Sequence, residues 1–294
     1  MKIGVIGLGR MGRGIAGRVL GAGHDLAVYN RTSGKDADLV AAGARSVASI
    51  ALACEQRDVV VTMLADEAAL DAVALGAGGV RDSLPVGAIH LVMGTHGVGI
   101  VRALTAAHAA AGQTLVAAPV LGRPDAAASG QLGIVAAGPA EALQRCKPLL
   151  GVIGRLTFEA GASPDAATSI KLANNFMLGC AVQAMGEAYS LVRRFGVAPQ
   201  VLHDVMTEGL FSAPAYKVYG KIMADEAYDN VGFTTRLALK DMSLVLAAGD
   251  MARLPLPSGE YRLRVTGDGG AEAPVEATIG ETMTSTVRVS LHDG

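Results

Sequence analysis

The 294-residue sequence has no tryptophan, little other aromatic content and only three cysteines. The cysteines show neither a paired pattern nor a metal-ligand spacing, so we expect reduced thiols in a cytoplasmic protein and no metal site. A strong charge of either sign is also missing, because 25 Lys and Arg stand against 27 Asp and Glu. Nucleic-acid and membrane-surface proteins need a basic face, so the sequence argues against both kinds of partner.

No segment suits a membrane span either. The longest charge-free run, 103–122, contains a histidine, a glutamine and a proline, which a spanning helix rarely tolerates. Residues 1–7 lead directly into an apolar strand pattern and lack the apolar segment and cleavage site of a secretory signal. Hydrophobic residues make up 51% of the chain, enough for a full core. The length predicts about two domains.

Over residues 1–160, short runs rich in valine and isoleucine alternate with alanine-rich helical stretches. The runs are too short for helices and predict strands at 2–7, 25–29, 59–63, 88–92, 115–118 and 133–137. This alternation predicts an α/β domain in which helices cover both faces of a doubly wound parallel sheet.

The pattern becomes helical over residues 161–257. Ser163 as N-cap, Pro164 at the first helical position and Asp165 near the positive end of the dipole predict a long helix that ends near Gly196. Further helices are predicted at 200–208, 213–224 and 237–248, so we expect an all-helical second domain. Residues 258–294 alternate in part with period two and predict an atypical tail, strand-like or loosely ordered.

A glycine-rich motif follows the first predicted strand and opens a helical stretch: Gly7-Leu8-Gly9-Arg10-Met11-Gly12. In such a motif the first glycine permits a tight turn, the second lets the backbone approach a pyrophosphate, and the third allows close helix–strand packing. The N–H groups at the helix start attract phosphate charge. The strand–turn–helix context therefore predicts a dinucleotide-binding Rossmann domain over residues 1–160.

The end of the second predicted strand bears on which dinucleotide binds. NAD sites usually place an acidic residue there, whereas this chain has Asn30, Arg31 and Thr32, followed by Lys35. Arg31 can lie against a 2′-phosphate, and Thr32 and Lys35 can add donors, so the segment favours NADP(H). The alternative is that Arg31 and Lys35 are solvated surface charges.

These residues and several later motifs make the chain similar to the β-hydroxyacid dehydrogenases, a family that includes 3-hydroxyisobutyrate dehydrogenase, tartronate semialdehyde reductase and glyoxylate/succinic semialdehyde reductase. The resemblance covers residues 1–257 and, besides the glycine motif, includes Gly23-His24, Asn30-Arg31-Thr32, Met63-Leu64, Gly94-Thr95, Ala118-Pro119-Val120, Gly130-Gln131-Leu132, Lys171-Leu172-Ala173-Asn174-Asn175 and Lys240-Asp241. It implies an NADP-binding Rossmann domain, a helical domain for substrate binding and dimerisation over 161–257, and a homodimer.

Lys171, Asn174 and Asn175 form the chemical centre of this resemblance. Their spacings of three and four put them on one face of a helix. Carbonyl reduction by hydride needs a donor at the oxygen, where negative charge develops, and a lysine ammonium supplies both charge and proton. Spacing alone favours an exposed helix lysine with polar neighbours. The resemblance implies instead that Lys171 is the general acid/base and that Asn174 or Asn175 orients it or the substrate.

The resemblance also implies other contacts. The residues expected beside the cofactor are Met63, Leu64, Thr95 and Lys240. Phe233 is expected to pack in the interdomain cleft and to contact the substrate. Thr95 follows Gly94, where the family usually has serine. His96 has no identifiable carboxylate partner in the sequence, so we give it no catalytic role.

The predicted substrate loop departs from the family pattern, which reads Asp-Ala-Pro-Val-Ser-Gly-Gly. Here Leu121 replaces the serine, Gly122 keeps the first glycine and Arg123 replaces the second. Arg123 could receive a substrate carboxylate bidentately, or it could face solvent and leave a more apolar pocket. With Lys171 and Asn175, these three residues are the expected substrate contacts.

We therefore expect a cytoplasmic NADP(H)-dependent oxidoreductase that transfers a hydride between nicotinamide and a small hydroxy acid or aldehyde acid. Two alternatives stay open. An imine reductase shares the architecture, although those enzymes commonly carry Asp or Tyr where this chain has Lys171. A module that binds NADP(H) without turnover is favoured slightly by the altered loop and opposed by the intact lysine cluster.

Overall fold

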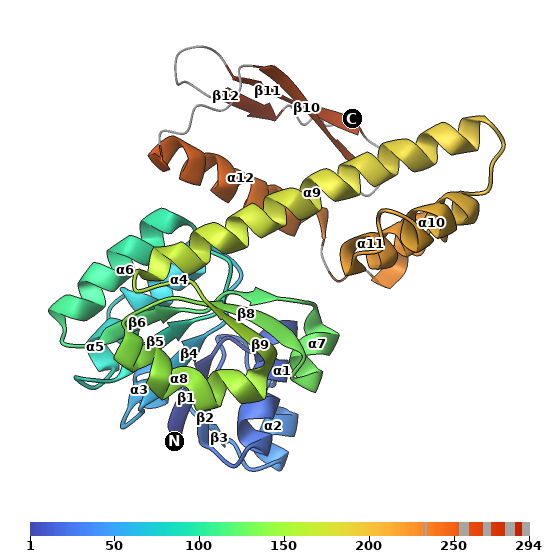
Figure 1. Cartoon of the computed structure of the whole chain (residues 1–294). Coiled ribbons are helices and arrows are strands. Elements are labelled where there is room, and N and C mark those ends of the chain that lie inside the picture. Colours follow the sequence, from blue (N-terminus) through green and yellow to red (C-terminus); the bar gives the residue numbers. More distant parts are fainter. Residues whose placement is uncertain (231, 233, 253–258, 267–271, 280–285, 290–294) are drawn as a thin grey trace.

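The computed structural model describes the chain except for residues 231, 233, 253–258, 267–271, 280–285 and 290–294. An N-terminal α/β domain is followed by a long helix that runs away from it and leads into further helices (Figure 1). Within the described ranges, none of the helices is both long and apolar enough to cross a bilayer.

The first domain is built on a six-stranded, fully parallel sheet. In spatial order its strands are β3 (Arg45–Ser46), β2 (Asp25–Tyr29), β1 (Lys2–Ile6), β4 (Val59–Thr62), β5 (Ile89–Val92) and β6 (Thr114–Ala117). The order reverses direction at β1 and β4, and in doubly wound sheets ligands bind outside the carboxyl ends of the strands at this point.

Helices cover both faces of this sheet, as the strand–helix alternation predicts. They are α1 (Arg10–Gly21), α2 (Ala37–Ala41), α3 (Ile50–Cys54), α4 (Glu67–Ala74), α5 (Val80–Ser83) and α6 (Val98–Ala110). Successive side chains of a strand point to opposite faces of the sheet. In β1, Ile3 and Val5 pack in the cluster that includes Ile15 of α1. Ile6 packs in a separate cluster with Cys54 of α3.

One strand prediction needs a correction, because the run 133–137 does not join the parallel sheet. It forms β8 (Leu132–Ala136) of a second sheet, between β7 (Val120–Leu121) and β9 (Gly154–Glu159). β8 pairs antiparallel with β7 and parallel with β9. The chain keeps the direction of β6 through Pro119 into β7, since Ala117 pairs antiparallel with Ala137 and Val120 pairs antiparallel with Ile134. It reverses direction between β7 and β8, in the connection that contains α7 (Pro124–Ser129), whereas α8 (Ala140–Ile153) connects β8 to β9.

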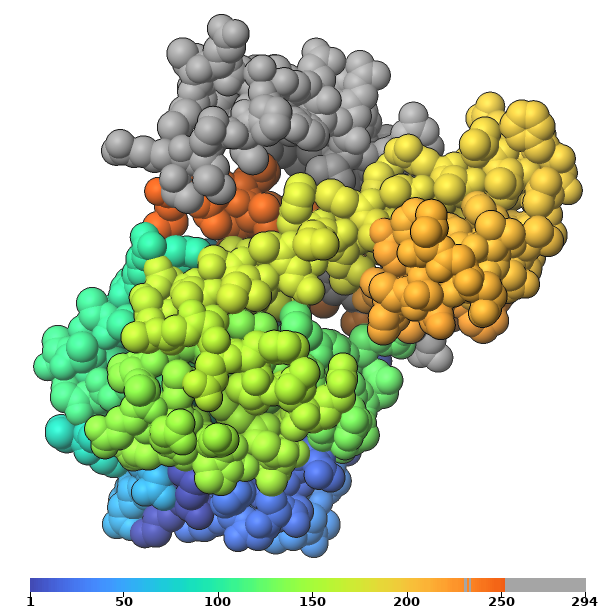
Figure 2. All heavy atoms as spheres, viewed as in Figure 1, coloured from blue at the N-terminus to red at the C-terminus, as the bar shows by residue number. Residues whose placement is uncertain are grey.

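The helical part begins with α9 (Pro164–Arg194) and continues with α10 (Pro199–Glu208), α11 (Pro214–Ala224), a 3-10 turn η1 (Tyr228–Asn230) and α12 (Thr235–Ala252). The predicted start of α9 is confirmed, with Ser163 as the N-cap residue and Asp165 in the first turn. Pro164 is at the first helical position, but the Ser163 hydroxyl bonds the Asp165 carboxylate instead of capping the helix. Met185 and Tyr189 of α9 pack with Met206 of α10. The end of α9, α10 and α11 form an outer lobe that stands apart from the first domain (Figure 2).

Beyond α12 the described residues form three strands, β10 (Gly259–Thr266), β11 (Glu272–Ile279) and β12 (Thr286–Val289). They pair antiparallel in the order β10-β11-β12.

Candidate functional site

The glycine-rich loop lies at the carboxyl end of β1 and starts α1. Gly7 has a φ of +96°, and a Cβ added there would lie 2.4 Å from the Met63 carbonyl oxygen. A Cβ added at Gly12 would lie 1.9 Å from the Gly7 carbonyl oxygen. Both positions therefore need glycine because backbone from neighbouring elements approaches them closely.

Gly9 differs from these two glycines because it faces open space. It is the N-cap of α1, it has no side-chain cap, and nothing lies within 4 Å of a Cβ added there. The first turn of α1 carries no acidic residue. Exposed backbone N–H groups at a helix start without a carboxylate suit a phosphate, so the residues present fit a dinucleotide. The exposed Arg10 and half-buried Met11 begin this helix.

Asn30 connects the two loops that are expected to hold the dinucleotide. Its side-chain oxygen accepts a hydrogen bond from the Leu8 N–H at 2.9 Å, and its amide donates to the Thr32 carbonyl at 2.8 Å. Arg31, Thr32 and Lys35 are exposed beside it. The Asn30 side chain is thus engaged with backbone, whereas Arg31 and Lys35 are the cations that could contact a ligand.

Lys171 and Asn175 are buried near the start of α9, where this helix packs against β6, β8 and α6. Lys171 Nζ donates to Asn175 Oδ1 at 3.0 Å, and Asn175 Nδ2 donates to Asp241 Oδ2 at 2.6 Å. Asn174 is exposed, and its amide is 3.4 Å from Asn175 Oδ1. The structure therefore joins Lys171 to Asn175 and leaves Asn174 at the edge of the cluster.

Burial is the main cause that lowers the pKa of Lys171 to about 8; the Asp241 carboxylate opposes this shift and the Lys240 charge adds to it. A lysine with this pKa exchanges its proton near neutral pH, as a general acid/base requires. Asp241 belongs to the Lys240-Asp241 motif of the sequence, which by itself indicates no role for the carboxylate. It lies three residues before the buried Leu244 on α12, so helical periodicity could have placed it on the inner face.

Lys240 links α12 to two loops of the first domain. Its ammonium donates to the Thr95 carbonyl at 2.8 Å and to the Ala65 carbonyl at 3.3 Å, and it pairs with Asp241 at 3.0 Å. Thr95 follows β5 by three residues, and the half-buried Met63 and Leu64 directly follow β4. These residues meet at the carboxyl edge of the sheet, together with the end of β1 that carries the glycine loop.

In the predicted substrate loop, Arg123 lies close to residues of the helical domain. The guanidinium of Arg123 lies beside Gly232, where an added Cβ would meet Nε at 2.6 Å. Burial raises the pKa of Tyr219 on α11, and the nearby Arg123 charge opposes this shift. Arg123 Nε is buried without a hydrogen-bond partner among the described residues, and the Asp125 carboxylate is 3.8 Å away. Among the described residues, Arg123 therefore has one long ion pair with Asp125 and no hydrogen bond at Nε.

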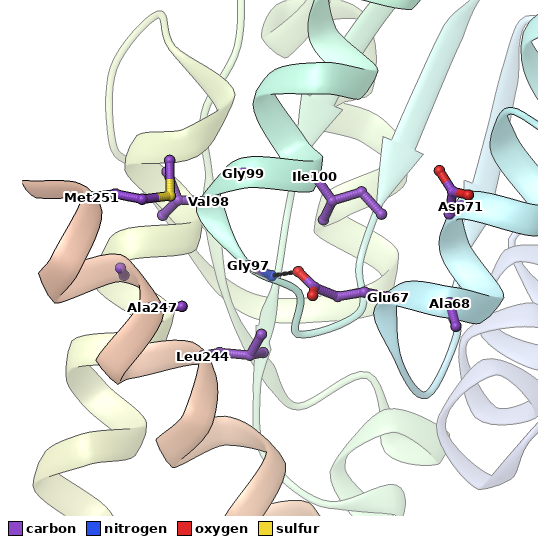
Figure 3. A pocket seen from close by; sticks show the side chains of 11 residues that line it. Glu67, Ala68, Asp71, Gly97, Val98, Gly99, Ile100, Leu244, Ala247 and Met251 are labelled. Carbon is purple, nitrogen blue, oxygen red and sulfur yellow. Dashed lines mark hydrogen bonds between the residues drawn. The ribbon is translucent and has the colours of Figure 1, made fainter. Parts of the chain in front are cut away.

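Leu121 is half-buried and packs beside the cluster that includes Val135, whereas Gly122 is exposed with a φ of +141°. Phe233, the remaining predicted substrate contact, lies outside the described residues. A separate cavity of about 360 Å³ lies between α4, α6 and α12 (Figure 3). At its edge the Glu67 carboxylate accepts the Gly97 N–H at 2.8 Å. In the part of the chain that is described, no three His, Cys, Asp or Glu side chains converge as a metal site would need.

Two protein-family models match this chain. Residues 2–162 match the NAD-binding domain of 6-phosphogluconate dehydrogenase. Residues 166–276 match the NAD-binding domain of NADP-dependent 3-hydroxyisobutyrate dehydrogenase.

Individual proteins agree with these matches. The chain is 42% identical to the uncharacterized oxidoreductase YfjR of Bacillus subtilis, over 88% of this chain and 91% of that protein. It is 32% identical to 3-hydroxyisobutyrate dehydrogenase of Pseudomonas aeruginosa, over 87% and 88% of the two chains. The crystal structure of 3-hydroxyisobutyrate dehydrogenase from Salmonella typhimurium superposes with a TM-score of 0.78 at 26% identity, covering 87% of this chain and 90% of that one.

Proposed function

The chain belongs to the 3-hydroxyisobutyrate dehydrogenase family of oxidoreductases, and we propose that it is an NADP(H)-dependent member that uses Lys171 as general acid/base. Its substrate in this proposal is a small aldehyde acid in one direction and the matching hydroxy acid in the other. The observation that carries the proposal is the buried Lys171 ammonium, which Asn175 orients at the junction of the two domains.

The residues divide the reaction between them. A bound nicotinamide dinucleotide supplies the hydride in reduction and accepts it in oxidation. Lys171 Nζ donates a proton to the carbonyl oxygen as negative charge develops there, and it takes the proton back from the hydroxyl in oxidation. Asn175 accepts one Lys171 N–H and so fixes the direction of the ammonium.

Two features support NADP(H) over NAD(H). The residue after β2 is Asn30, whose side chain is engaged by Leu8 and Thr32, so a ribose-binding carboxylate is missing from this position. Arg31 and Lys35 are exposed beside it and can pair with a 2′-phosphate. Calorimetric titration with NADP⁺ and NAD⁺ tests this preference. Arg31→Ala should weaken NADP⁺ binding and leave NAD⁺ binding nearly unchanged, whereas Arg155→Ala on exposed β9 serves as control.

Arg123 supports a substrate that carries a carboxylate. Its Nε atom is buried without a hydrogen-bond partner among the described residues, and its ion pair with Asp125 is long at 3.8 Å, so a substrate carboxylate could supply the missing hydrogen bond. Leu121 takes the place of a hydroxyl-bearing residue, which removes one polar contact from the same loop. We therefore choose succinic semialdehyde and glyoxylate as the first substrates to test.

A substrate panel read by NADPH absorbance tests the activity. We expect oxidation of NADPH with a semialdehyde acid and little with a cyclic imine. Turnover of the imine alone would replace this proposal with an imine reductase. Binding of NADP⁺ without oxidation of NADPH across carbonyls and imines would replace it with a non-catalytic binding module.

Lys171→Ala tests the proposed acid directly. We expect kcat to fall by about 100-fold or more while the Kd for NADP⁺ changes little. Lys147→Ala, on the exposed side of α8, is the matched control and should keep full activity. Equal turnover of Lys171→Ala and wild type would contradict the proposed role.

We also propose that the protein is a cytoplasmic homodimer. The three cysteines, Cys54, Cys146 and Cys180, form no disulfide, which supports a reducing compartment. Exposed apolar side chains at the end of α9 and on α10 support a partner surface: Leu191, Phe195, Val201 and Val205. Analytical ultracentrifugation tests the dimer, and a Val205→Glu variant should sediment as a monomer.

A further inference from the structure

The loop between β5 and α6 contains a histidine that the proposed mechanism does not use. The loop is anchored at both ends, since the Met93 N–H donates to the Thr62 carbonyl at 3.0 Å and the Gly97 N–H donates to Glu67. Figure 3 shows the Glu67 carboxylate pointing at the Gly97 nitrogen. Between these anchors lie Thr95 and His96. The Thr95 carbonyl oxygen accepts a hydrogen bond from the Lys240 ammonium.

His96 points inwards and fills the space between two loops. Only 2% of its surface is exposed. The ring folds back over Gly94, where an added Cβ would lie 2.3 Å from His96 Nε2 and 2.8 Å from the Leu64 carbonyl oxygen. The imidazole therefore occupies the place of the missing Gly94 side chain, next to the loop that follows β4. Gly94 and His96 depend on each other for this packing.

The surroundings of His96 accept the uncharged ring and disfavour a charged one. Neither ring nitrogen has a hydrogen-bond partner among the described residues. Lys240 on α12 faces the ring with a positive charge, while Asp66 before α4 opposes that effect more weakly. His90 on β5, itself buried, is also within electrostatic range. Burial and the Lys240 charge together lower the pKa of His96 to about 4.

Lys240 is the group that a charge on His96 would disturb. Its ammonium binds carbonyls from both loops that His96 separates, Ala65 after β4 and Thr95 after β5. This bridge attaches α12 to the carboxyl edge of the sheet, where the proposed dinucleotide binds. A second cation beside it, without an acceptor, would repel the ammonium from those carbonyls.

We propose that His96 is a positioning residue, whose buried and uncharged side chain lets Lys240 bridge Ala65 and Thr95 across the two loops. The ring acts through Lys240 and the loops and touches neither substrate nor cofactor. This inference rests on the proposed function, because the loops matter only if a dinucleotide binds at their edge. It predicts that charge at position 96, rather than loss of the imidazole itself, impairs binding.

Calorimetric titration with NADP⁺ at pH 7.5 tests the proposal in four variants. His96→Gln, uncharged, should keep the Kd within about threefold of wild type, whereas His96→Lys should raise it at least tenfold. The other two variants combine each of these substitutions with Lys240→Met. In that background the difference in Kd between the Gln and Lys variants should largely disappear, because the repulsion needs both cations. Equal Kd values for His96→Gln and His96→Lys, or an unchanged difference in the Lys240→Met background, would overturn the proposal.

A second measurement covers the case in which His96→Lys does not fold. Proton NMR titration of the His96 ring should give a pKa that rises by about one unit or more in Lys240→Met, since a neighbouring cation is removed. An unchanged His96 pKa would overturn the proposal. If wild type binds neither NADP⁺ nor NAD⁺, the proposed function fails; if wild type binds and these comparisons fail, only the role of His96 is lost. His24→Gln, near the N-terminus, is the control and should match wild type.

Discussion

The Asn175 side chain joins Lys171 to Asp241, because its oxygen accepts the Lys171 ammonium and its amide donates to the Asp241 carboxylate. This places one side-chain amide between the proposed acid on α9 and the only acidic member of the cluster on the described part of α12. Asn175→Ala should therefore leave Lys171 buried but unoriented, and kcat should fall about 100-fold. Steady-state kinetics with NADPH and a semialdehyde acid measure this, and the neighbouring exposed Asn174→Ala should lose less than threefold. Equal losses in the two variants would contradict the arrangement.

The pH dependence of turnover should follow the lowered pKa of Lys171. Because this pKa is about 8, the ammonium is present at neutral pH and is lost as pH rises through about 8. Reduction needs the proton and should decline above that pH, whereas oxidation needs the free amine and should increase until it levels off. Asp241→Asn removes the carboxylate that favours the charged form, so both profiles should move to lower pH. Profiles that do not move in Asp241→Asn would contradict this assignment.

The two glycines of the loop should respond differently to one added methyl group. Gly12→Ala places Cβ 1.9 Å from the Gly7 carbonyl oxygen and should lower the free energy of unfolding by about 1–3 kcal/mol. Gly9→Ala meets nothing within 4 Å, so stability should be kept. Its methyl group instead occupies the space that a pyrophosphate needs, and the Kd for NADP⁺ should rise about tenfold or more. Urea unfolding and calorimetry separate the two effects, and tight NADP⁺ binding by Gly9→Ala would be evidence against this phosphate site.

Buried histidines should make the fold sensitive to acid. Thr62 Oγ1, His90, His108 and Gln113 form a chain of contacts at 2.9, 2.8 and 2.6 Å. The Gln113 amide nitrogen donates to two backbone carbonyls, so the Gln113 side-chain oxygen accepts from His108 Nδ1. If both rings are neutral, His108 Nε2 then accepts from His90 Nδ1, and His90 Nε2 accepts from the Thr62 hydroxyl. Burial is the main cause that lowers the pKa of His90, His96 and His108.

The free energy of unfolding should fall as the pH falls, because the unfolded chain binds more protons than the folded protein. Below pH about 6.5 the unfolded chain protonates these histidines while the folded protein resists, so stability is complete above that pH and is lost as pH falls. The slope should approach about 1.4 kcal/mol per pH unit for each such histidine. Urea unfolding at a series of pH values from neutral downwards measures it. His108→Leu should be less stable than wild type at neutral pH, because the His90 N–H and the Gln113 oxygen lose their partner. Stability that stays constant below pH 6.5 would refute the neutral chain.

Arg123→Gly restores the residue type that the family usually has at this position. If Arg123 receives the substrate carboxylate, KM for an aldehyde acid should rise by about 10–100-fold, as expected for one lost charge-assisted hydrogen bond. The Kd for NADP⁺ should stay the same. An uncharged aldehyde of similar size is the control substrate, and its kcat/KM should be unaffected. A KM that rises equally for both substrates would place Arg123 outside carboxylate recognition.

Local patterns in the sequence were sufficient for most of the fold. Strands of the parallel sheet have continuous apolar runs because both faces are buried, as at Val59–Thr62. The glycine motif is equally local, since Gly7 and Gly12 are required by backbone that approaches them closely, while Gly9 leaves open space at the start of α1. The run 133–137 has the same composition as the sheet strands, and only pairing with β7 and β9 separates it from them.

Contacts between distant segments were beyond such patterns. The sequence pointed to Lys171 and Asn175 through their spacing, but Asp241 meets them from 66 residues beyond Asn175. His96 had no visible partner in the sequence, and its significance comes from burial beside Lys240, which depends on how α12 packs against the first domain. Arg123 was found as a departure from a pattern, and its approach to Gly232 needed the folded chain.

Helix α9 is one uninterrupted rod that starts on the first domain and ends at the far lobe (Figure 1). Ala167 and Leu172 fix its first turns in the core, so Lys171 travels with the sheet that is proposed to carry the hydride source. From Asn175 to Arg194 the rod extends about 29 Å, and a bend of about 10° would swing α10 and α11 by about 5 Å. Such a change in the direction of the rod would move the outer lobe without moving Lys171 relative to the sheet.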